Sequence, residues 1–235
     1  MMDRTMELLD RLPGLIDHTI LRPEATRADV LRLCEEAKRF GFTVIFVPPC
    51  YIEEAAAAVR GTGIRVGMPV GFPLGGQTTD AKVAEAREGV VLGATMLDMV
   101  LNVSRLKSGD LDYVRRDMAE VVRATPGVEH KVILETCLLT REEKQIACRL
   151  AVEAGMDYVK TSTGFAAGGA TVEDVRLMKD AVAGRARVKA SGGIRDLTTT
   201  LALLDAGADR IGTSAGFKIL EEAAAQRLAT ARVSS

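Results

Sequence analysis

Short runs of β-branched and apolar residues alternate with longer stretches of helical period along most of this 235-residue chain. Eight runs have the length and composition of β-strands: LIDHT (15–19), TVIFV (43–47), IRVGMPV (64–70), MLDMVL (96–101), KVILET (131–136), DYVKT (157–161), RVKA (187–190) and RIGT (210–213). Amphipathic helices are predicted over 26–40, 76–92, 108–124, 140–154, 171–182 and 196–206. Several of them end in glycine just before the next strand, as helices commonly do. Strands that alternate with helices pair in parallel through right-handed crossovers.

The number of strand–helix units favours a closed barrel. No stretch rich in proline, glycine and serine divides the chain, so the units form one continuous series. We predict a single α/β domain over residues 1–235, a (β/α)8 TIM barrel with an additional N-terminal helix in MMDRTMELLDRLPG. A doubly wound open sheet is the alternative, but it normally has fewer strands, and no GxGxxG follows the first predicted strand.

The charge balance points to a small-molecule partner. Lysine and arginine total 31 against 32 aspartate and glutamate, and the formal net charge is −1, so we expect neither nucleic acid nor an acidic membrane surface as partner. No apolar run reaches the length of about 20 residues that a membrane span needs, and no signal peptide is evident, which favours a cytoplasmic location. Four cysteines without a CxxC spacing and two histidines supply a metal site poorly.

Two lysines close predicted strands, and this position carries the main functional inference. Lys160 in DYVKTSTG and Lys189 in ARVKASGG each precede a turn of small residues, at the barrel face where active sites form. Partial burial and mutual repulsion lower the pKa of a lysine and release the neutral amine that attacks carbonyl carbons. The pair therefore suggests Schiff-base chemistry, although each lysine could instead extend to solvent or bind an anion. Lys131 opens its predicted strand and is expected at the opposite, stabilising face.

Carboxylates on other strands could complete such a site. Asp98 interrupts the apolar run MLDMVL, and we interpret it as a proton relay that pairs with one of the lysines, with a structural ion pair as the alternative. Asp17 in LIDHT and Glu135 in ILETC are candidates for contacts with substrate hydroxyl groups, but structural networks also use such carboxylates.

Three glycine-rich stretches follow the last three predicted strands. They are TSTGFAAGGAT after the sixth strand, SGGIRD after the seventh and GTSAGF after the eighth. Loops after the seventh and eighth strands of a barrel commonly bind phosphate, because exposed backbone amides and helix N-termini favour an anion. The sequence therefore predicts a phosphorylated substrate.

Several motifs, in order, resemble the deoxyribose-phosphate aldolase family over roughly residues 15 to 217. They are IDHTILRPEAT, GFPLGGQTTDAKVAEAREGVVLGA, LDMVLNV with LKSGD, KVILETCLLT, GMDYVKTSTGFAAGGATVEDVRLM, VKASGGIRD and RIGTSAG. The resemblance implies a class I aldolase that reversibly joins acetaldehyde and glyceraldehyde 3-phosphate into 2-deoxyribose 5-phosphate. It implies no metal and no organic cofactor, and a homodimer or homotetramer.

The resemblance also implies roles for individual residues. Lys160 would form the Schiff base, Lys189 would lower the pKa of Lys160, and Asp98 would relay protons. The predicted substrate and phosphate contacts are Asp17, Gly168, Gly169, Gly192, Gly193 and Ser214.

The chain departs from the family pattern at a few positions that bear on substrate preference. FVPPCY stands where CVNPSY is common, which puts Phe46 and Pro48 near the barrel mouth, where a phenyl ring would narrow the pocket. Ser104 replaces a common glycine and is followed by Arg105, and Arg22 replaces a lysine. We expect both arginines to form rim ion pairs or to be solvated.

Three other functions fit the same residues. A class I aldolase of this family could act on a different phosphorylated sugar or donor. A sugar-phosphate isomerase or epimerase could use Asp98 as base without a covalent intermediate. A non-catalytic barrel could bind a phosphosugar without turnover, but paired lysines would then have no use.

Overall fold

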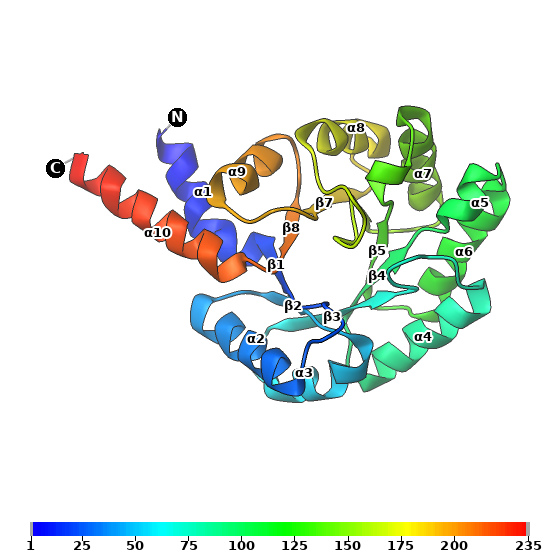
Figure 1. Cartoon of the computed structure of the whole chain (residues 1–235), viewed down its shortest axis with the longest axis horizontal. Helices are drawn as coiled ribbons and strands as arrows, with labels where there is room; N and C mark the ends of the chain where they lie inside the picture. The colour runs from blue at the N-terminus through cyan, green and yellow to red at the C-terminus, as the bar shows by residue number, and fades with distance from the viewer. Residues whose placement is uncertain (1, 234–235) are drawn as a thin grey trace.

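Eight parallel strands close into a barrel in the computed structural model, which describes the backbone of residues 2–233 and the side chains of residues 7–228 (Figure 1). The strands are β1 (Ile16–Thr19), β2 (Val44–Phe46), β3 (Arg65–Val70), β4 (Met96–Val100), β5 (Glu129–Ile133), β6 (Tyr158–Lys160), β7 (Arg187–Ser191) and β8 (Arg210–Thr213). Each strand pairs with the next, and β8 pairs with β1. The predicted TIM barrel is therefore confirmed, and the open sheet is wrong.

Helices surround the barrel and connect its strands (Figure 1). They are α1 (Met2–Leu15), α2 (Arg27–Phe40), α3 (Ile52–Ala58), α4 (Thr79–Leu92), α5 (Val103–Lys107), α6 (Leu111–Ala124), α7 (Arg141–Glu153), α8 (Val172–Val182), α9 (Leu197–Asp205) and α10 (Gly216–Val233). Short 3-10 turns, η1 (Pro49–Tyr51) and η2 (Thr136–Leu138), follow β2 and β5. α3 and α5 have no separate counterpart among the predicted helices. Within residues 2–233, no helix combines the length and apolar character needed to span a membrane.

Side-chain caps and glycines set the helix ends. Thr26 and Thr140 form capping boxes that satisfy free amides at the starts of α2 and α7. Gly41 and Gly93 end α2 and α4 with φ angles of 76° and 113°, a conformation that glycine adopts at little cost. The glycines predicted at these helix ends therefore stand where the chain must turn back toward the next strand.

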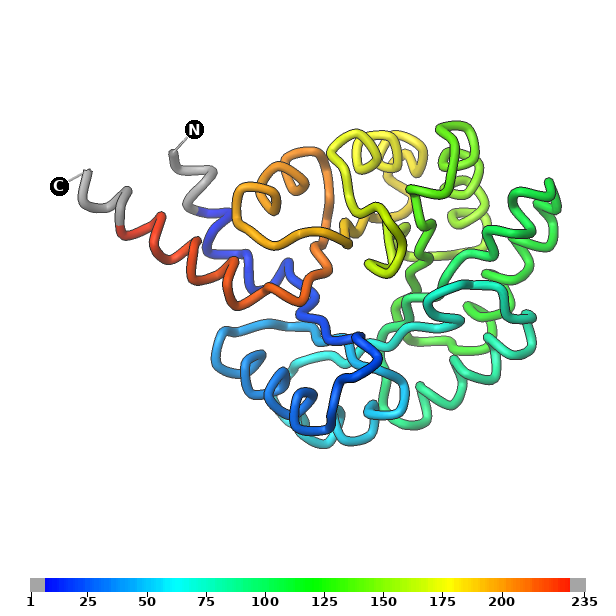
Figure 2. Tube along the Cα trace, viewed as in Figure 1, coloured from blue at the N-terminus to red at the C-terminus, as the bar shows by residue number. Residues whose placement is uncertain are grey.

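The additional N-terminal helix α1 packs beside α10 outside the barrel (Figures 1 and 2). Arg227 of α10 lies 2.6 Å from Asp10 of α1. The two ends of the fold thereby support each other next to β1 and β8, where the barrel closes.

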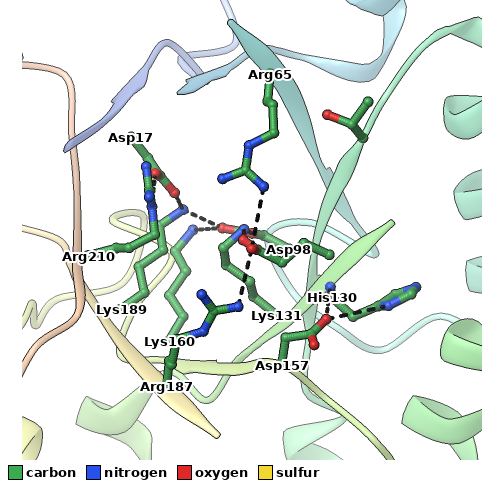
Figure 3. A network of polar contacts seen from close by, with 12 residues as sticks. Asp17, Arg65, Asp98, His130, Lys131, Asp157, Lys160, Arg187, Lys189 and Arg210 are labelled. Carbon is green, nitrogen blue, oxygen red and sulfur yellow. Dashed lines mark hydrogen bonds and ion pairs between the residues drawn. The ribbon is translucent and has the colours of Figure 1, made fainter. Parts of the chain in front are cut away.

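The apolar core lies mainly between the strands and the helices. Outward-facing strand residues such as Ile45, Val132 and Val188 are fully buried in one large cluster with the helices. A small separate cluster inside the barrel contains Val44, Phe46 and Met96. Much of the remaining interior is charged: Asp17, Arg65, Asp98, Glu129, Lys131, Lys160, Arg187, Lys189 and Arg210 (Figure 3). Buried charges at this density need specific partners, which the strands supply.

Candidate active site

Lys160 and Lys189 meet at one carboxylate inside the barrel (Figure 3). The two lysines are register partners on β6 and β7, so their side chains share the inner face. Lys160 Nζ lies 2.8 Å and Lys189 Nζ lies 2.7 Å from Oδ2 of Asp98 on β4. The structure therefore brings together the three residues that the sequence predicts as catalytic.

The two amines have opposite pKa shifts. Burial lowers the pKa of Lys160 to about 8, and the nearby Lys189 acts in the same direction, against the attraction of Asp98. Burial also acts to lower the pKa of Lys189, but Asp17 and Asp98 together outweigh it and raise the pKa above its ordinary value. Lys160 is thus the amine that is neutral in a useful fraction near neutral pH, while Lys189 stays a cation.

Asp98 remains ionised although it is fully buried. Burial acts to raise its pKa, but Lys160, Lys189 and Lys131 together hold the pKa far below the ordinary range. A carboxylate that accepts from both lysines can receive and return protons beside the Lys160 amine.

Asp17 belongs to the same network, one step away from Lys160. Its Oδ2 lies 2.6 Å from Lys189 Nζ, and its Oδ1 accepts a 2.6 Å hydrogen bond from Arg210 Nε. The side chain is fully buried and does not line the cavity described below. In this arrangement Asp17 secures Lys189, and its predicted contact with substrate stays a prediction.

Lys131 does not lie where the sequence places it. It was expected to open its strand at the stabilising face, but β5 starts at Glu129, and Lys131 is a fully buried residue in the middle of that strand. Its Nζ lies 3.3 Å from Asp98 Oδ1 and 3.0 Å from Glu129 Oε1. The expectation is wrong because the strand extends two residues further back, where the Glu129 amide bonds to Thr95 O.

A cavity of about 510 Å³ opens above Lys160 at the C-terminal ends of the strands. Lys160, Ser191, Gly192, Gly193, Arg195 and Ser214 are among the residues that line it. Lys189 and Asp98 do not line it, so Lys160 is the member of the trio that a ligand in the cavity can reach. Only 5% of Lys160 is exposed, which keeps its amine at the floor of the cavity.

Three of the predicted phosphate-binding residues, Gly192, Gly193 and Ser214, border this cavity. Gly192 and Gly193 have φ angles of 88° and 77°, a conformation that other residues rarely adopt. Ser214 lies just before the N-terminus of α10, where backbone amides and the helix dipole favour an anion.

Gly168 and Gly169 do not border the cavity but support the loop that does. A Cβ atom on Gly169 would clash with the Gly192 carbonyl oxygen, and the amide of Ala170 donates to that oxygen at 3.0 Å. A Cβ atom on Gly168 would meet Cys137. The structure thus places both glycines behind the predicted phosphate site, and their contact with phosphate stays a prediction.

Arg195 is a cavity residue that the sequence analysis did not single out. It follows the paired glycines within SGGIRD, and an arginine so close to an anion-binding loop is the signal that would have identified it. Phe165, which is 47% exposed, also lines the cavity and packs edge-on against Phe72, with ring centroids 5.2 Å apart.

Phe46 lies below the lysines and does not narrow the cavity mouth, which corrects the expectation from the sequence. The ring is buried against Gly67, where a Cβ atom would clash with it. Lys189 Nζ lies 3.9 Å from the ring centroid, close enough for a cation–π contact. The ring faces inward because Phe46 ends β2 in register with Gly67, which leaves space for it.

Glu135 connects two loops above the barrel. It accepts hydrogen bonds from the amide and the hydroxyl group of Thr163, which ties the loop after β6 to the end of β5. Arg22 lies 2.8 Å from Asp29 and Arg105 lies 3.0 Å from Asp110, so both form the rim ion pairs that were expected. Within the described residues, no three His, Cys, Asp or Glu side chains lie close enough together to hold a metal ion.

Comparison with known proteins gives consistent matches over most of the chain. A family model described as DeoC/LacD family aldolase matches residues 14–222. The deoxyribose-phosphate aldolase of Thermoanaerobacter sp. (strain X514) is 53% identical over 211 residues, which are 88% of this chain and 95% of that protein. The deoxyribose-phosphate aldolase of Brevibacillus brevis is 52% identical over 205 residues, 87% of this chain and 93% of that protein.

Solved structures match over a similar share of the chain. The structure titled QR15, an aldolase, has a TM-score of 0.89 at 42% identity and covers 92% of this chain and 97% of its own. The tetrameric deoxyribose phosphate aldolase of Aeropyrum pernix has a TM-score of 0.84 at 34% identity and covers 92% and 95%.

Proposed function

Since the chain belongs to the DeoC/LacD family of aldolases, we propose that Lys160 is the Schiff-base residue of an aldolase that acts on 2-deoxyribose 5-phosphate. The reaction is the reversible cleavage of this sugar phosphate to acetaldehyde and glyceraldehyde 3-phosphate. The observation that carries the proposal is the position of Lys160, whose pKa is lowered to about 8 at the floor of the cavity, with Asp98 and Lys189 beside it.

The covalent part of the mechanism follows from amine chemistry. Neutral Lys160 Nζ attacks C1 of the open-chain aldehyde, and the carbinolamine loses water to give an iminium ion. The iminium accepts the electron pair of the C2–C3 bond as that bond breaks, while the C3 hydroxyl group gives up its proton and becomes the aldehyde of glyceraldehyde 3-phosphate. The enamine that remains is protonated at C2, and hydrolysis releases acetaldehyde and free Lys160.

Asp98 and Lys189 supply and accept the protons of these steps. Asp98 Oδ2 lies 2.7 Å from Lys189 Nζ and 2.8 Å from Lys160 Nζ, short enough for proton transfer along the carboxylate. Lys189 stays charged between Asp17 and Asp98, and its positive charge helps to keep the Lys160 amine neutral.

The far end of the substrate would be held by its phosphate. Gly192, Gly193 and Ser214 offer backbone amides or a hydroxyl group at the cavity wall, and Arg195 adds a positive charge. Binding the phosphate there fixes the sugar so that its aldehyde lies over Lys160, which converts part of the binding energy into orientation.

The remaining predictions form part of this proposal. We propose that the whole chain acts as one domain, in the cytoplasm, and as a homodimer or homotetramer. The tetrameric structure of the Aeropyrum pernix relative supports the oligomer. Light scattering of the purified protein would measure the number of subunits.

Product analysis tests the proposed reaction. Incubation with 2-deoxyribose 5-phosphate should release acetaldehyde and glyceraldehyde 3-phosphate in equal amounts, and Lys160→Met should abolish this release. Lys144→Met is a matched control, because Lys144 pairs with Asp174 in the outer helices and lies outside the cavity. Release of other products, or isomerisation without cleavage, would overturn the proposal.

A further inference from the structure

The second oxygen of Asp98 has a partner that the proposed mechanism does not use. Oδ2 of Asp98 contacts Lys160 and Lys189, whereas Oδ1 lies 3.3 Å from Nζ of Lys131. Lys131 is fully buried in the middle of β5, and a lysine is almost never buried completely without a specific partner. The arrangement raises the question of what a third ammonium group does at this carboxylate.

Lys131 is held from below by Glu129, two residues earlier on the same strand and on the same inner face. Its Nζ lies 3.0 Å from Glu129 Oε1. The Glu129 carboxylate is in turn 3.5 Å from Arg65 and 3.4 Å from Arg187, both about half exposed at the N-terminal opening of the barrel. A continuous series of ion pairs therefore runs from solvent at one end of the barrel to Lys160 at the other (Figure 3).

Two aromatic rings restrict Lys131 from the sides. Its Nζ lies 5.1 Å from the centroid of Phe46 and 5.4 Å from that of Tyr158, within the range of cation–π attraction. With Glu129 below, the rings beside it and Asp98 in front, the ammonium group has a defined position. A positive charge fixed at Oδ1 in turn fixes the rotation of the carboxylate, so that Oδ2 faces both Lys160 and Lys189.

We propose that Lys131 is a positioning residue for the aldolase reaction. Held by Glu129, it orients the Asp98 carboxylate and competes with Lys160 for electrostatic attraction to that carboxylate, which keeps the Lys160 amine available in neutral form. This inference rests on the proposed function. The charged and titratable groups that face this network from the surrounding strands are Asp17, Arg65, Asp98, Glu129, Tyr158, Lys160, Arg187, Lys189 and Arg210.

Two substitutions in the network should move the pH profile in opposite directions. Methionine has a side chain of similar length to that of lysine but carries no charge. In Lys131→Met the pKa of Lys160 should therefore rise by about one unit, and kcat/KM below that pKa should fall about tenfold. Glu129→Gln removes a negative charge beside Lys131, so the same limb of the profile should move to lower pH. The measurement is kcat/KM for 2-deoxyribose 5-phosphate as a function of pH.

Lys82→Met is the matched control, because Lys82 is also a fully buried lysine, paired with Asp117 at 2.6 Å between α4 and α6. It should lower the unfolding temperature without moving the pH profile. If Lys131→Met does not fold, Glu129→Gln alone still tests the proposal, because general damage to the barrel would not improve the supply of neutral amine at low pH.

The outcomes separate this inference from the proposed function. Opposite shifts of the limb in the two variants support the positioning role. A wild-type enzyme that cleaves the substrate, together with folded variants whose profiles match the wild type, would overturn the role of Lys131 and leave the proposed function intact. A wild-type enzyme that releases no acetaldehyde would instead overturn the proposed function.

Discussion

At the scale of single residues, two lysine side chains in the site differ in pKa because their neighbours differ. Lys160 contacts one carboxylate, and its pKa is lowered to about 8 chiefly by burial. Lys189 lies between two carboxylates, and its pKa is raised. One amine is thereby suited to attack a carbonyl carbon, and the other to hold charge, which is the division of roles that Schiff-base catalysis requires.

Asp98→Asn should separate imine formation from turnover. Because Asp98 acts to raise the pKa of Lys160, its loss should lower that pKa further and leave the amine nucleophilic. The proton transfers should fail, so kcat should fall by about 10²- to 10⁴-fold. Steady-state kinetics with borohydride trapping of acetaldehyde would measure both effects, and a variant with wild-type kcat would contradict the relay.

The sequence identified Lys160, Lys189 and Asp98 better than the side chains that surround them. Lys160, Lys189 and Asp98 interrupt apolar runs, so both their burial and their meeting point followed from a barrel with parallel strands. The predicted positions of Lys131 and Phe46 were wrong. A strand boundary that shifts by two residues, or a side chain that lies one layer deeper in the barrel, moves that side chain between the barrel opening and the interior. Depth within a barrel depends on the stagger of all its strands, which the sequence alone does not reveal.

At the scale of elements, the loops after β6 and β7 form one unit. Ala170 donates to the Gly192 carbonyl oxygen, and the Ser191 amide donates to Thr161 Oγ1 at 3.0 Å. The turn of Gly192 and Gly193 is therefore set partly by the neighbouring loop. The sequence predicted the glycine-rich loops, and the family resemblance implied ligand contacts for Gly168 and Gly169. The structure places these glycines against Cys137 and Gly192, and their contact with a ligand stays a prediction.

Gly169→Ala should selectively weaken binding of the substrate phosphate. A Cβ atom at Gly169 clashes with the backbone of Gly192. The clash is relieved only if the loop that carries Gly192 moves, and this loop borders the cavity. We expect KM for 2-deoxyribose 5-phosphate to rise about tenfold or more, with little change in any activity toward unphosphorylated 2-deoxyribose.

The control for this substitution is Gly76→Ala, since a Cβ atom there meets nothing within 4 Å. Comparison of the two substrates for each variant is the measurement. Equal losses with both substrates in Gly169→Ala would show that the loop does not act through phosphate.

At the scale of the whole molecule, the charged interior contributes to barrel closure as well as to the site. Asp17 on β1 joins Lys189 on β7 and Arg210 on β8, across the junction where the first and last strands meet. The same contacts that hold Lys189 in place therefore also connect the two ends of the barrel. The closed topology was predictable from eight strand–helix units, but this ionic junction was not, because it depends on which inward residues share a layer.

Asp17→Asn should destabilise the protein by about 3 kcal/mol near neutral pH, because it removes one partner from a buried ion pair. Burial acts to raise the pKa of Asp17, but Lys189 and Arg210, with help from Lys131, outweigh it and lower the pKa. A lowered pKa means that the contribution of Asp17 is complete above the ordinary value of 3.8 and is lost as the pH falls through the lower, folded value. The difference in unfolding free energy between the variant and the wild type should therefore shrink in acid.

Denaturant unfolding at several pH values measures this difference. Asp112→Asn provides the control, because the Asp112 side chain is 97% exposed in its pair with Arg115. A loss of stability in Asp17→Asn no larger than in Asp112→Asn would contradict the role of Asp17 in barrel closure.

The claim that unites these scales is that Lys160, and neither Lys189 nor Lys131, is the nucleophile. Borohydride reduction in the presence of 2-deoxyribose 5-phosphate, followed by intact mass and peptide mapping, tests it most directly. The account predicts an N-ethyl adduct, derived from acetaldehyde, on the peptide that contains Lys160, with a yield that rises with pH toward about 8. An adduct on Lys189 or Lys131, or turnover without any trapped adduct, would contradict it.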